Sequence, residues 1–208
     1  MKWVLGFLVA VLVLAGVGDA LARSAAEKRA ADHVQRSLDL DEAPKVSLGG
    51  WPFLVHALRG SFPTIEVTVG SLRARGVELE EVNVILQDVE VELEKILAGS
   101  AEGVRSKSGR GQAALTEDEL NRVVARAGPA ATVRLDGNQV FVEVEGREVP
   151  GRVEVTGSQL VIRSKGLPDA LRVELPGVIE GLTYEEVEVR DGRAHLSFGL
   201  SGARLRAP

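Results

Sequence analysis

The hydrophobic pattern begins with an apolar run at the N-terminus, from Trp3 to Gly18. Lys2 precedes this run, and Asp19 ends it. Ala20-Leu21-Ala22 follows, which is a small-residue site of the kind that an export peptidase cleaves. Together these are the parts of an export signal. Residues 1–22 are therefore predicted to be a signal peptide or an N-terminal membrane anchor, and residues 23–208 to form a single domain outside the cytoplasm.

The length of the run leaves both alternatives open. Trp3 to Val17 would make roughly 22 Å of helix, which is short of the roughly 30 Å hydrocarbon core of a bilayer. However, no helix breaker follows Ala22, and small or apolar residues continue at a spacing of four, typical of one helical stripe. This stripe consists of Ala22, Ala26, Ala30, Val34 and Leu38. A helix over residues 4–38 is therefore predicted, which favours a retained anchor over cleavage after Ala22.

Most of the remaining chain alternates apolar and polar residues with a period of two. Such alternation is typical of half-buried strands in antiparallel sheets that have one face in water. The first block of predicted strands is Ile65–Val69, Val77–Leu79, Val82–Leu86 and Val89–Leu93. The second block is Ala131–Leu135, Val140–Val144, Arg152–Val155, Leu160–Arg163, Leu171–Leu175, Glu186–Arg190 and Ala194–Leu200.

Two segments between these blocks break the alternation. Ser100–Gly111 is rich in Gly, Ser and charge and has no apolar period, so it is predicted to be a mobile loop. Thr116 with Glu119 three residues later forms a capping-box pattern, and Gly128-Pro129 would stop a helix. A short helix over residues 117–126 is therefore predicted.

This order of elements predicts an α+β fold with about ten antiparallel strands and few helices. No sequence period repeats at a fixed length, which argues against a propeller or a solenoid. The long sheet must bury its apolar face. It can curl around one helix, fold on itself, or hold something apolar that is not protein.

Composition narrows the classes of function. The hydrophobic content of 45% and charged content of 26% are ordinary for a globular chain. The net charge of −5 argues against nucleic acid and against electrostatic adhesion to anionic lipid, so any lipid contact should be apolar. The absence of cysteine excludes disulfides, thiolate metal sites and cysteine nucleophiles.

No pattern in the sequence indicates catalysis, a metal or a cofactor. The three histidines, His33, His56 and His195, are isolated from one another, with no partner at ligand spacing. Ser158 is not in a nucleophile elbow, and Gly109-Arg110-Gly111 lacks the context of a dinucleotide loop. An enzyme is therefore not expected.

The turn Gly49-Gly50-Trp51-Pro52-Phe53-Leu54 concentrates apolar residues outside the alternating strands. A functional interpretation is a mouth or a membrane-facing tip, because Trp rings prefer the membrane interface. The alternative is a plug that closes one end of the core, since proline and two glycines also suit a buried sharp turn.

This turn, with Leu58-Arg59-Gly60 and the alternating Ile65-Glu66-Val67 after it, resembles the signature of the LmeA-like phospholipid-binding proteins of bacterial envelopes. The helix that follows the apolar run, the Leu115–Asn121 segment, Leu175-Pro176 and Asp191-Gly192 agree with that order of parts. The resemblance covers most of residues 19–205. It implies a tubular lipid-binding type of fold, in which a long curved antiparallel sheet wraps around the N-terminal helix.

The resemblance also implies non-catalytic binding of phospholipid, with no catalytic residues to transfer. Trp51, Pro52, Phe53 and Leu54 are predicted as lipid-binding residues at the entrance for acyl chains. The expected partners are phospholipid and, through the N-terminal segment, the cytoplasmic membrane. The alternative function is a membrane-anchored structural or adaptor domain, with no lipid cavity, that binds another envelope protein.

Overall fold

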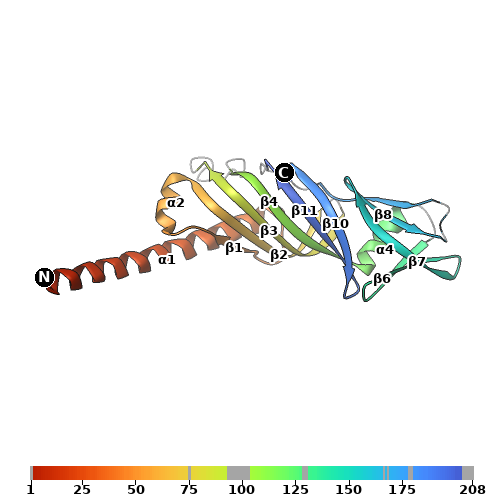
Figure 1. Ribbon diagram of the computed structural model, residues 1–208, viewed down its shortest axis with the longest axis horizontal. Helices are drawn as coiled ribbons and strands as arrows, with labels where there is room; N and C mark the ends of the chain where they lie inside the picture. The colour runs from red at the N-terminus through yellow and green to blue at the C-terminus, as the bar shows by residue number, and fades with distance from the viewer. Residues whose placement is uncertain are drawn as a thin grey trace.

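The computed structural model describes residues 2–74, 76–92, 104–127, 131–165, 167, 169–177 and 180–202. Within these residues the helices are α1 Lys2–Leu38, α2 Phe53–Arg59 and α4 Glu117–Ala127 (Figure 1). The strands are β1 Lys45–Leu48, β2 Ser61–Ala74, β3 Val77–Val91, β4 Val104–Thr116, β5 Ala131–Asp136, β6 Gln139–Val144, β7 Arg147–Thr156, β8 Gln159–Ser164, β9 Leu171–Glu174, β10 Leu182–Arg190 and β11 Arg193–Ser201. The predicted α+β class is confirmed, and α1 and α4 are the two predicted helices.

The strands are divided between two antiparallel sheets. The six-stranded sheet has the order β1-β2-β3-β4-β11-β10, and the five-stranded sheet has the order β5-β6-β7-β8-β9. The six-stranded sheet is curled as a half-barrel, with α1 against its edge strand β1. The five-stranded sheet lies at the end of the molecule remote from α2, and its strands β6 and β7 pack against β10 (Figure 1).

One face of the six-stranded sheet is apolar across its full width. Directly opposite residues of antiparallel strands lie on the same face, so the register defines rows of side chains that cross the sheet. Two rows contain only apolar residues, tyrosine or glycine. They are Leu48–Ile65–Leu86–Gly109–Leu200–Leu182 and Val46–Val67–Val84–Gly111–Phe198–Tyr184. We call the surface that these rows form the apolar face.

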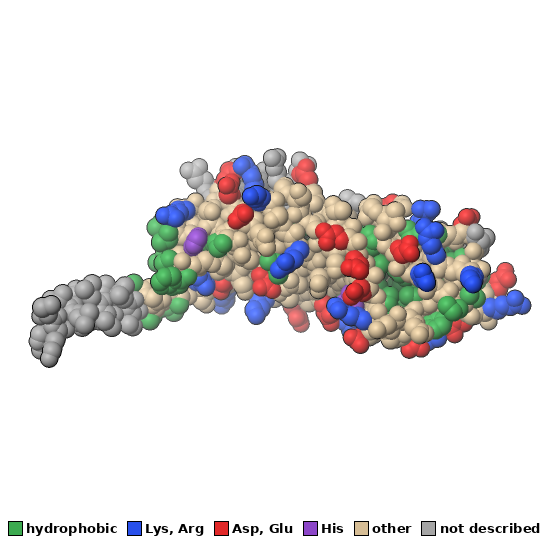
Figure 2. Space-filling model, in the orientation of Figure 1, with side chains coloured by type: hydrophobic (Ala, Val, Ile, Leu, Met, Phe, Trp, Pro, Cys, Tyr) green, Lys and Arg blue, Asp and Glu red, His purple; other side chains and the backbone are tan. Residues whose placement is uncertain are grey.

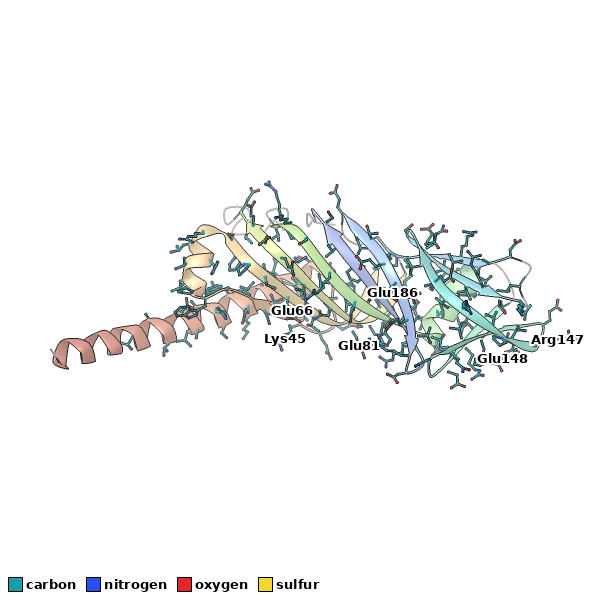
Figure 3. All side chains as sticks on the ribbon, in the orientation of Figure 1. Lys45, Glu66, Glu81, Arg147, Glu148 and Glu186 are labelled. Carbon is teal, nitrogen blue, oxygen red and sulfur yellow. The ribbon has the colours of Figure 1, made fainter. Side chains whose placement is uncertain are left out.

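The opposite face of the same sheet is polar. The row beside the apolar ones is Lys45–Thr68–Asn83–Gln112–Ser197–Glu186. On this face the Asn83 amide donates to Glu66 Oε1 at 2.9 Å and to Thr68 Oγ1 at 3.0 Å. Figure 3 labels Lys45, Glu66 and Glu186, which lie on β1, β2 and β10. This division between the faces produces the period-two alternation of the sequence.

β4 corrects the prediction of a mobile loop over Ser100–Gly111. Residues 104–111 belong to a strand in the middle of the sheet, between β3 and β11, and residues 100–103 lie outside the described residues. A Cβ atom at Gly111 would lie 2.3 Å from two ring carbons of Phe198. A Cβ atom at Gly109 would lie 3.0 Å from Leu86 Cδ2. The glycines therefore admit large side chains from neighbouring strands, which removes the apolar period from β4 itself.

β3 is one strand where the sequence predicts three. Two residues with positive φ, Glu81 at 51° and Asp88 at 49°, separate the three predicted blocks. At the first of these, the register with β4 shifts between Glu80 and Asn83. A bulge of this kind changes which residues face the core, so the alternation reverses its phase within a single strand.

The five-stranded sheet encloses α4, which contacts both of its edge strands, β5 and β9. Leu120 and Val124 of α4 are fully buried in the core. They share that core with residues from the sheet, among them Val133, Val142, Leu160, Ile162 and Val173. The second sheet is therefore covered by a helix that the sequence predicts correctly.

Polar side chains of α4 also cover the free edge of β5. The Asn121 amide donates to the Val133 carbonyl and accepts from the Val133 N–H, both at 2.7 Å. The Glu117 carboxylate accepts from the Leu135 N–H at 2.6 Å. These bonds replace the missing neighbouring strand, since an unpaired edge otherwise presents free backbone groups.

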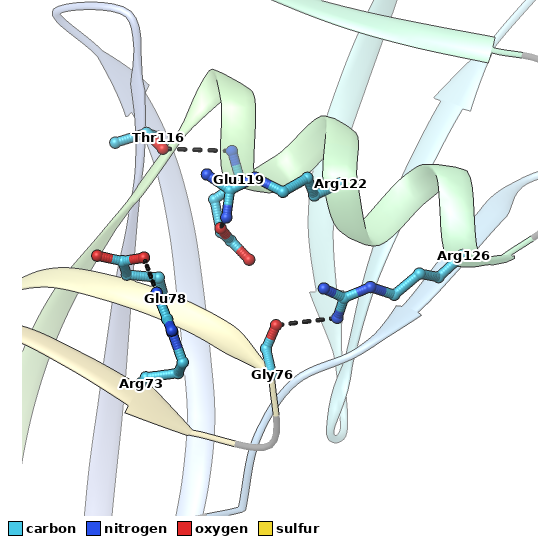
Figure 4. Close-up of polar contacts among 7 residues, drawn as sticks. All are labelled: Arg73, Gly76, Glu78, Thr116, Glu119, Arg122 and Arg126. Carbon is cyan, nitrogen blue, oxygen red and sulfur yellow. Dashed lines mark hydrogen bonds and ion pairs between the residues drawn. The ribbon is translucent and has the colours of Figure 1, made fainter. Parts of the chain in front are cut away.

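The start of α4 has the predicted cap. The Glu119 N–H donates to Thr116 Oγ1 at 3.3 Å, and the buried Glu119 carboxylate pairs with Arg122 (Figure 4). In the last turn, Arg126 donates to the Gly76 carbonyl at 2.9 Å (Figure 4). Because Gly76 lies between β2 and β3, this bond ties α4 to the six-stranded sheet.

α1 continues without a break through Ala22. Ala22, Ala26, Ala30 and Val34 of the predicted stripe are half-buried, and Ala22 and Ala26 pack against the core, whereas Leu38 is exposed. Over the residues that the structure describes, none of the helices has both the length and the apolar content of a membrane span.

The close contact at Gly111 gives a first prediction. Gly111→Ala should lower the free energy of unfolding by about 1–3 kcal/mol, because its Cβ overlaps the Phe198 ring and the sheet must shift to admit it. Gly70→Ala in β2 is the matched control, since a Cβ at Gly70 has nothing within 4 Å. Chemical denaturation of both variants measures the difference, and equal stability of the two would contradict the interpretation of β4.

Candidate functional site

α2 is attached to α1 through one carboxylate. The Asp19 side chain accepts hydrogen bonds from the Phe53 N–H at 2.9 Å and the Leu54 N–H at 2.8 Å. These are free N–H groups in the first turn of α2, and its N-cap residue, Pro52, provides no side-chain cap of its own. Asp19 is only 6% exposed. Asp19, the polar residue that ends the N-terminal apolar run, is therefore the cap of a helix that begins 34 residues later in the chain.

Hydrogen bonding also lowers the pKa of Asp19. The bond from the Leu54 N–H is the largest cause; burial opposes it, and the Phe53 N–H and the Arg23 charge add to it. Hence the carboxylate form is the one that the folded chain stabilises.

Arg23, one turn after Asp19, contacts the same segment. Its guanidinium donates to the Gly50 carbonyl and lies 6.0 Å from the centre of the Phe53 ring. Asp19 thus fixes the start of α2, and Arg23 fixes the turn before it. Sequence analysis missed this role, because the partners of both side chains lie 27 to 35 positions further along the chain.

The structure separates the four predicted lipid-binding residues. Trp51 is 80% exposed and Leu54 is 45% exposed. Phe53 is 4% exposed, and its ring centroid lies 6.0 Å from that of Phe62. Pro52 is exposed at the N-cap of α2. Phe53 therefore packs at the end of the core, as the plug interpretation expects of this residue, whereas Trp51 and Leu54 face outward. Lipid contact at this turn remains a prediction.

The outward side of α2 is an exposed apolar surface, formed by Trp51, Leu54, Val55 and Leu58. Figure 2 shows hydrophobic side chains gathered over α2 and the adjoining part of α1. We call these four residues the apolar tip. It lies at the end of the molecule from which the N-terminal part of α1 projects (Figure 1).

The apolar face is sealed unevenly. Leu86, Phe198 and Leu200 are buried on β3 and β11. On β2, Ile65 and Val67 are only half-buried, as are their polar neighbours Glu66 and Thr68 on the opposite face. Val84 and Leu48 beside them are half-buried too. All four of these half-buried side chains pack against the core, and Val46 of β1 is buried. Among the described residues, the β1–β3 part of the apolar face is therefore covered only in part.

Two open grooves lie toward the other end of the molecule. One, of about 510 Å³, lies at the junction of the sheets and is lined in part by Phe141, Val153, Val187 and Val189. The other, of about 550 Å³, lies over β7 and β8 beside Arg152, Arg163 and Lys165. They share Pro150, Gly151 and Arg152 and have the size of small-molecule pockets.

No arrangement of side chains in the described parts of the chain suggests metal chemistry. Among those residues, no group of three or more His, Asp and Glu side chains is placed to hold a metal ion. Acidic side chains of β3 pair with arginines: Arg73 pairs with Glu78 at 2.9 Å, and Arg193 with Glu81 at 2.8 Å. These contacts agree with a solvated strand face.

A model of the LmeA-like phospholipid-binding family matches residues 17–201. The chain belongs to this family. The match begins just before Asp19 and includes the apolar tip, the whole half-barrel and the five-stranded sheet. Searches of curated proteins and of solved structures gave no match. Membership of the LmeA-like family thus associates phospholipid binding with the whole domain.

The Asp19 cap gives a second prediction. Asp19→Asn should lower the melting temperature at pH 7, because a neutral amide accepts more weakly from the α2 N–H groups and loses the attraction of Arg23. Since folding lowers the pKa of this carboxyl, its contribution is complete above the ordinary value of 3.8 and is lost as the pH falls through the lower pKa of the folded chain. The melting temperatures of wild type and variant should therefore converge only below about pH 4. A constant gap down to pH 2 would contradict the cap.

Proposed function

We propose that this protein binds phospholipid without catalysis and holds acyl chains against the apolar face of the six-stranded sheet. Family membership supports phospholipid as the ligand class. The observation that carries the proposed position is the half-burial of Ile65, Val67 and Val84, which lie in apolar rows whose β11 members, Leu200 and Phe198, are buried. Apolar surface that the fold leaves incompletely covered is a suitable partner for acyl chains.

The energetics of this contact need no charged group. Each methylene removed from water contributes about 0.8 kcal/mol, so ten methylenes contribute roughly 8 kcal/mol before the cost of ordering the chain. The net charge of −5 favours such an apolar mode over attraction to anionic head groups. The junction groove continues the same apolar face, because Val187 lies opposite Leu196 and Val189 opposite Ala194.

The proposed location is the extracytoplasmic side of the cytoplasmic membrane of a bacterial envelope, with residues 1–22 retained. Lys2, the apolar run and Ala20-Leu21-Ala22 support export. Asp19 supports retention, since cleavage after Ala22 would remove the cap of α2. It would also remove Ala22, which packs against the core. A cleaved chain would therefore lose part of its own fold.

A substitution on the apolar face tests lipid binding. Val67→Phe should displace about three methylenes of a bound chain, which corresponds to about 2 kcal/mol or roughly a thirtyfold loss of affinity. Ile85→Phe is the matched control, since Ile85 is also half-buried but lies opposite Glu66 on the polar face. Titration of the detergent-solubilised full chain with a fluorescent phosphatidylcholine measures both affinities.

Equal affinities of the two variants would place the lipid elsewhere. A folded wild-type chain that binds no phospholipid at all would instead favour the membrane-anchored adaptor domain.

The location and the retained segment are tested together in bacterial cells. We expect the protein in the membrane fraction, accessible to protease added to spheroplasts, with an intact mass that includes residues 1–22. A mass corresponding to a chain that starts at Arg23 would contradict retention. Protection from protease until the cells are lysed would contradict export.

A further inference from the structure

The apolar tip is the exposed side of an amphipathic helix. Leu54, Val55 and Leu58 lie on one side of α2, with exposed fractions of 45%, 38% and 83%, and Trp51 precedes them at 80%. Phe53 is buried on the opposite side, and Ala57 packs against the core. Because Asp19 fixes α2 to α1, this surface cannot turn inward without losing the cap.

The adjoining part of α1 is apolar and exposed on every side. Residues 14–18, Leu14 to Gly18, are all exposed, and Asp19 directly after them is buried against α2. Leu14 is 71% exposed and Val17 is 54% exposed. A helix that is apolar all round belongs in a protein core or in lipid, and here no protein surrounds it in the described chain. The exposed apolar part of α1 thus ends beside α2, and the part of α1 that packs on the rest of the protein begins there.

We propose that the apolar tip docks on the lipid bilayer that receives the N-terminal run, with α2 lying in the interfacial plane beside α1. α1 is continuous, so the apolar run that would enter the bilayer leads directly to Asp19, which holds α2. α2 would therefore lie at the membrane surface, and this makes the bilayer the expected occupant of the apolar tip. A Trp at the edge of the patch suits this position, since Trp rings concentrate at the membrane interface. This inference rests on the proposed retention of residues 1–22 in the membrane. It adds the apolar tip as a second contact with the bilayer, and it does not require a lipid on the apolar face.

Docking of this kind orients the whole molecule. The α2 end of the half-barrel contacts the membrane, and the five-stranded sheet points away from it (Figure 1). The half-buried part of the apolar face, on β1 to β3, is then in the membrane-proximal sheet. A phospholipid would pass between the bilayer and this face beside α2.

Fluorescence of Trp51 tests the docking in the full chain. The protein contains two tryptophans, so Trp3→Phe leaves Trp51 as the only one. This variant is reconstituted in phosphatidylcholine vesicles with and without bromine on the acyl chains. We expect bromine to quench roughly half or more of the Trp51 emission, as for a ring at the interface. Unquenched emission typical of water would overturn the proposal.

Matched variants identify the contact. Leu58→Glu should reduce the quenching, because it places a carboxylate in the apolar surface, whereas Arg59→Glu on the same helix should leave it unchanged. A chain with Trp3→Phe, Trp51→Phe and Phe141→Trp reports from the remote sheet and should not be quenched. Loss of quenching with Arg59→Glu would overturn the apolar mode in favour of electrostatic attraction.

Two further outcomes are distinguishable. If the wavelength of the Trp51 emission changes with the protein-to-lipid ratio and bromine has no effect, a second copy of the chain covers the tip, and the proposal is wrong. Adding Val67→Phe to the Trp3→Phe chain separates docking from lipid binding. Quenching that persists supports docking even if lipid binding is lost, whereas quenching that disappears comes from a bound lipid and overturns docking.

Discussion

The apolar rows that cross the six-stranded sheet must be shielded from water, and the rest of the fold depends on how they are shielded. Each row brings a hydrophobic surface from the edge strand β1 to the opposite edge strand β10. At the β11 side, large side chains such as Phe198 and Leu200 fill the space. At the β1 side α1 contacts the sheet, and its Ala22 and Ala26 pack against the core. Small side chains leave room, and the same region remains half-buried.

The joint between α1 and α2 is polar within an otherwise apolar end of the molecule. A buried carboxylate needs donors, and the first turn of α2 supplies two N–H groups that have no partner within the helix. The carboxylate gains two donors and the N–H groups gain an acceptor, so α1 and α2 are joined in one specific arrangement. Arg23 adds a bond to the preceding turn and covers the Phe53 ring. The position of the apolar surface on α2 therefore depends on a hydrophilic contact beneath it.

Local sequence patterns predicted those elements whose stabilising contacts are also local. α4 carries its N-cap and its amphipathic pattern within its own residues, and most strands show their alternation directly. β4 could not be predicted because the side chains that fill its glycine positions come from β3 and β11. For the same reason the role of Asp19 as a helix cap could not be predicted, because its partners are Phe53 and Leu54. Trp51 and Phe53 are two positions apart, and only the packing shows that one is exposed and the other buried.

The glycines of β4 also bear on how the half-barrel acquires its bend. Gly109 and Gly111 lie in the same rows as Leu200 and Phe198, on the apolar face. Strand positions without Cβ atoms let the neighbouring chains approach each other on one side, which is how glycine kinks give a sheet its curvature. The curvature of the half-barrel is thus encoded in the chain itself. A ligand bound as proposed on the apolar face would not have to bend the sheet, so the free energy of its apolar contacts would go into affinity rather than into reshaping the protein.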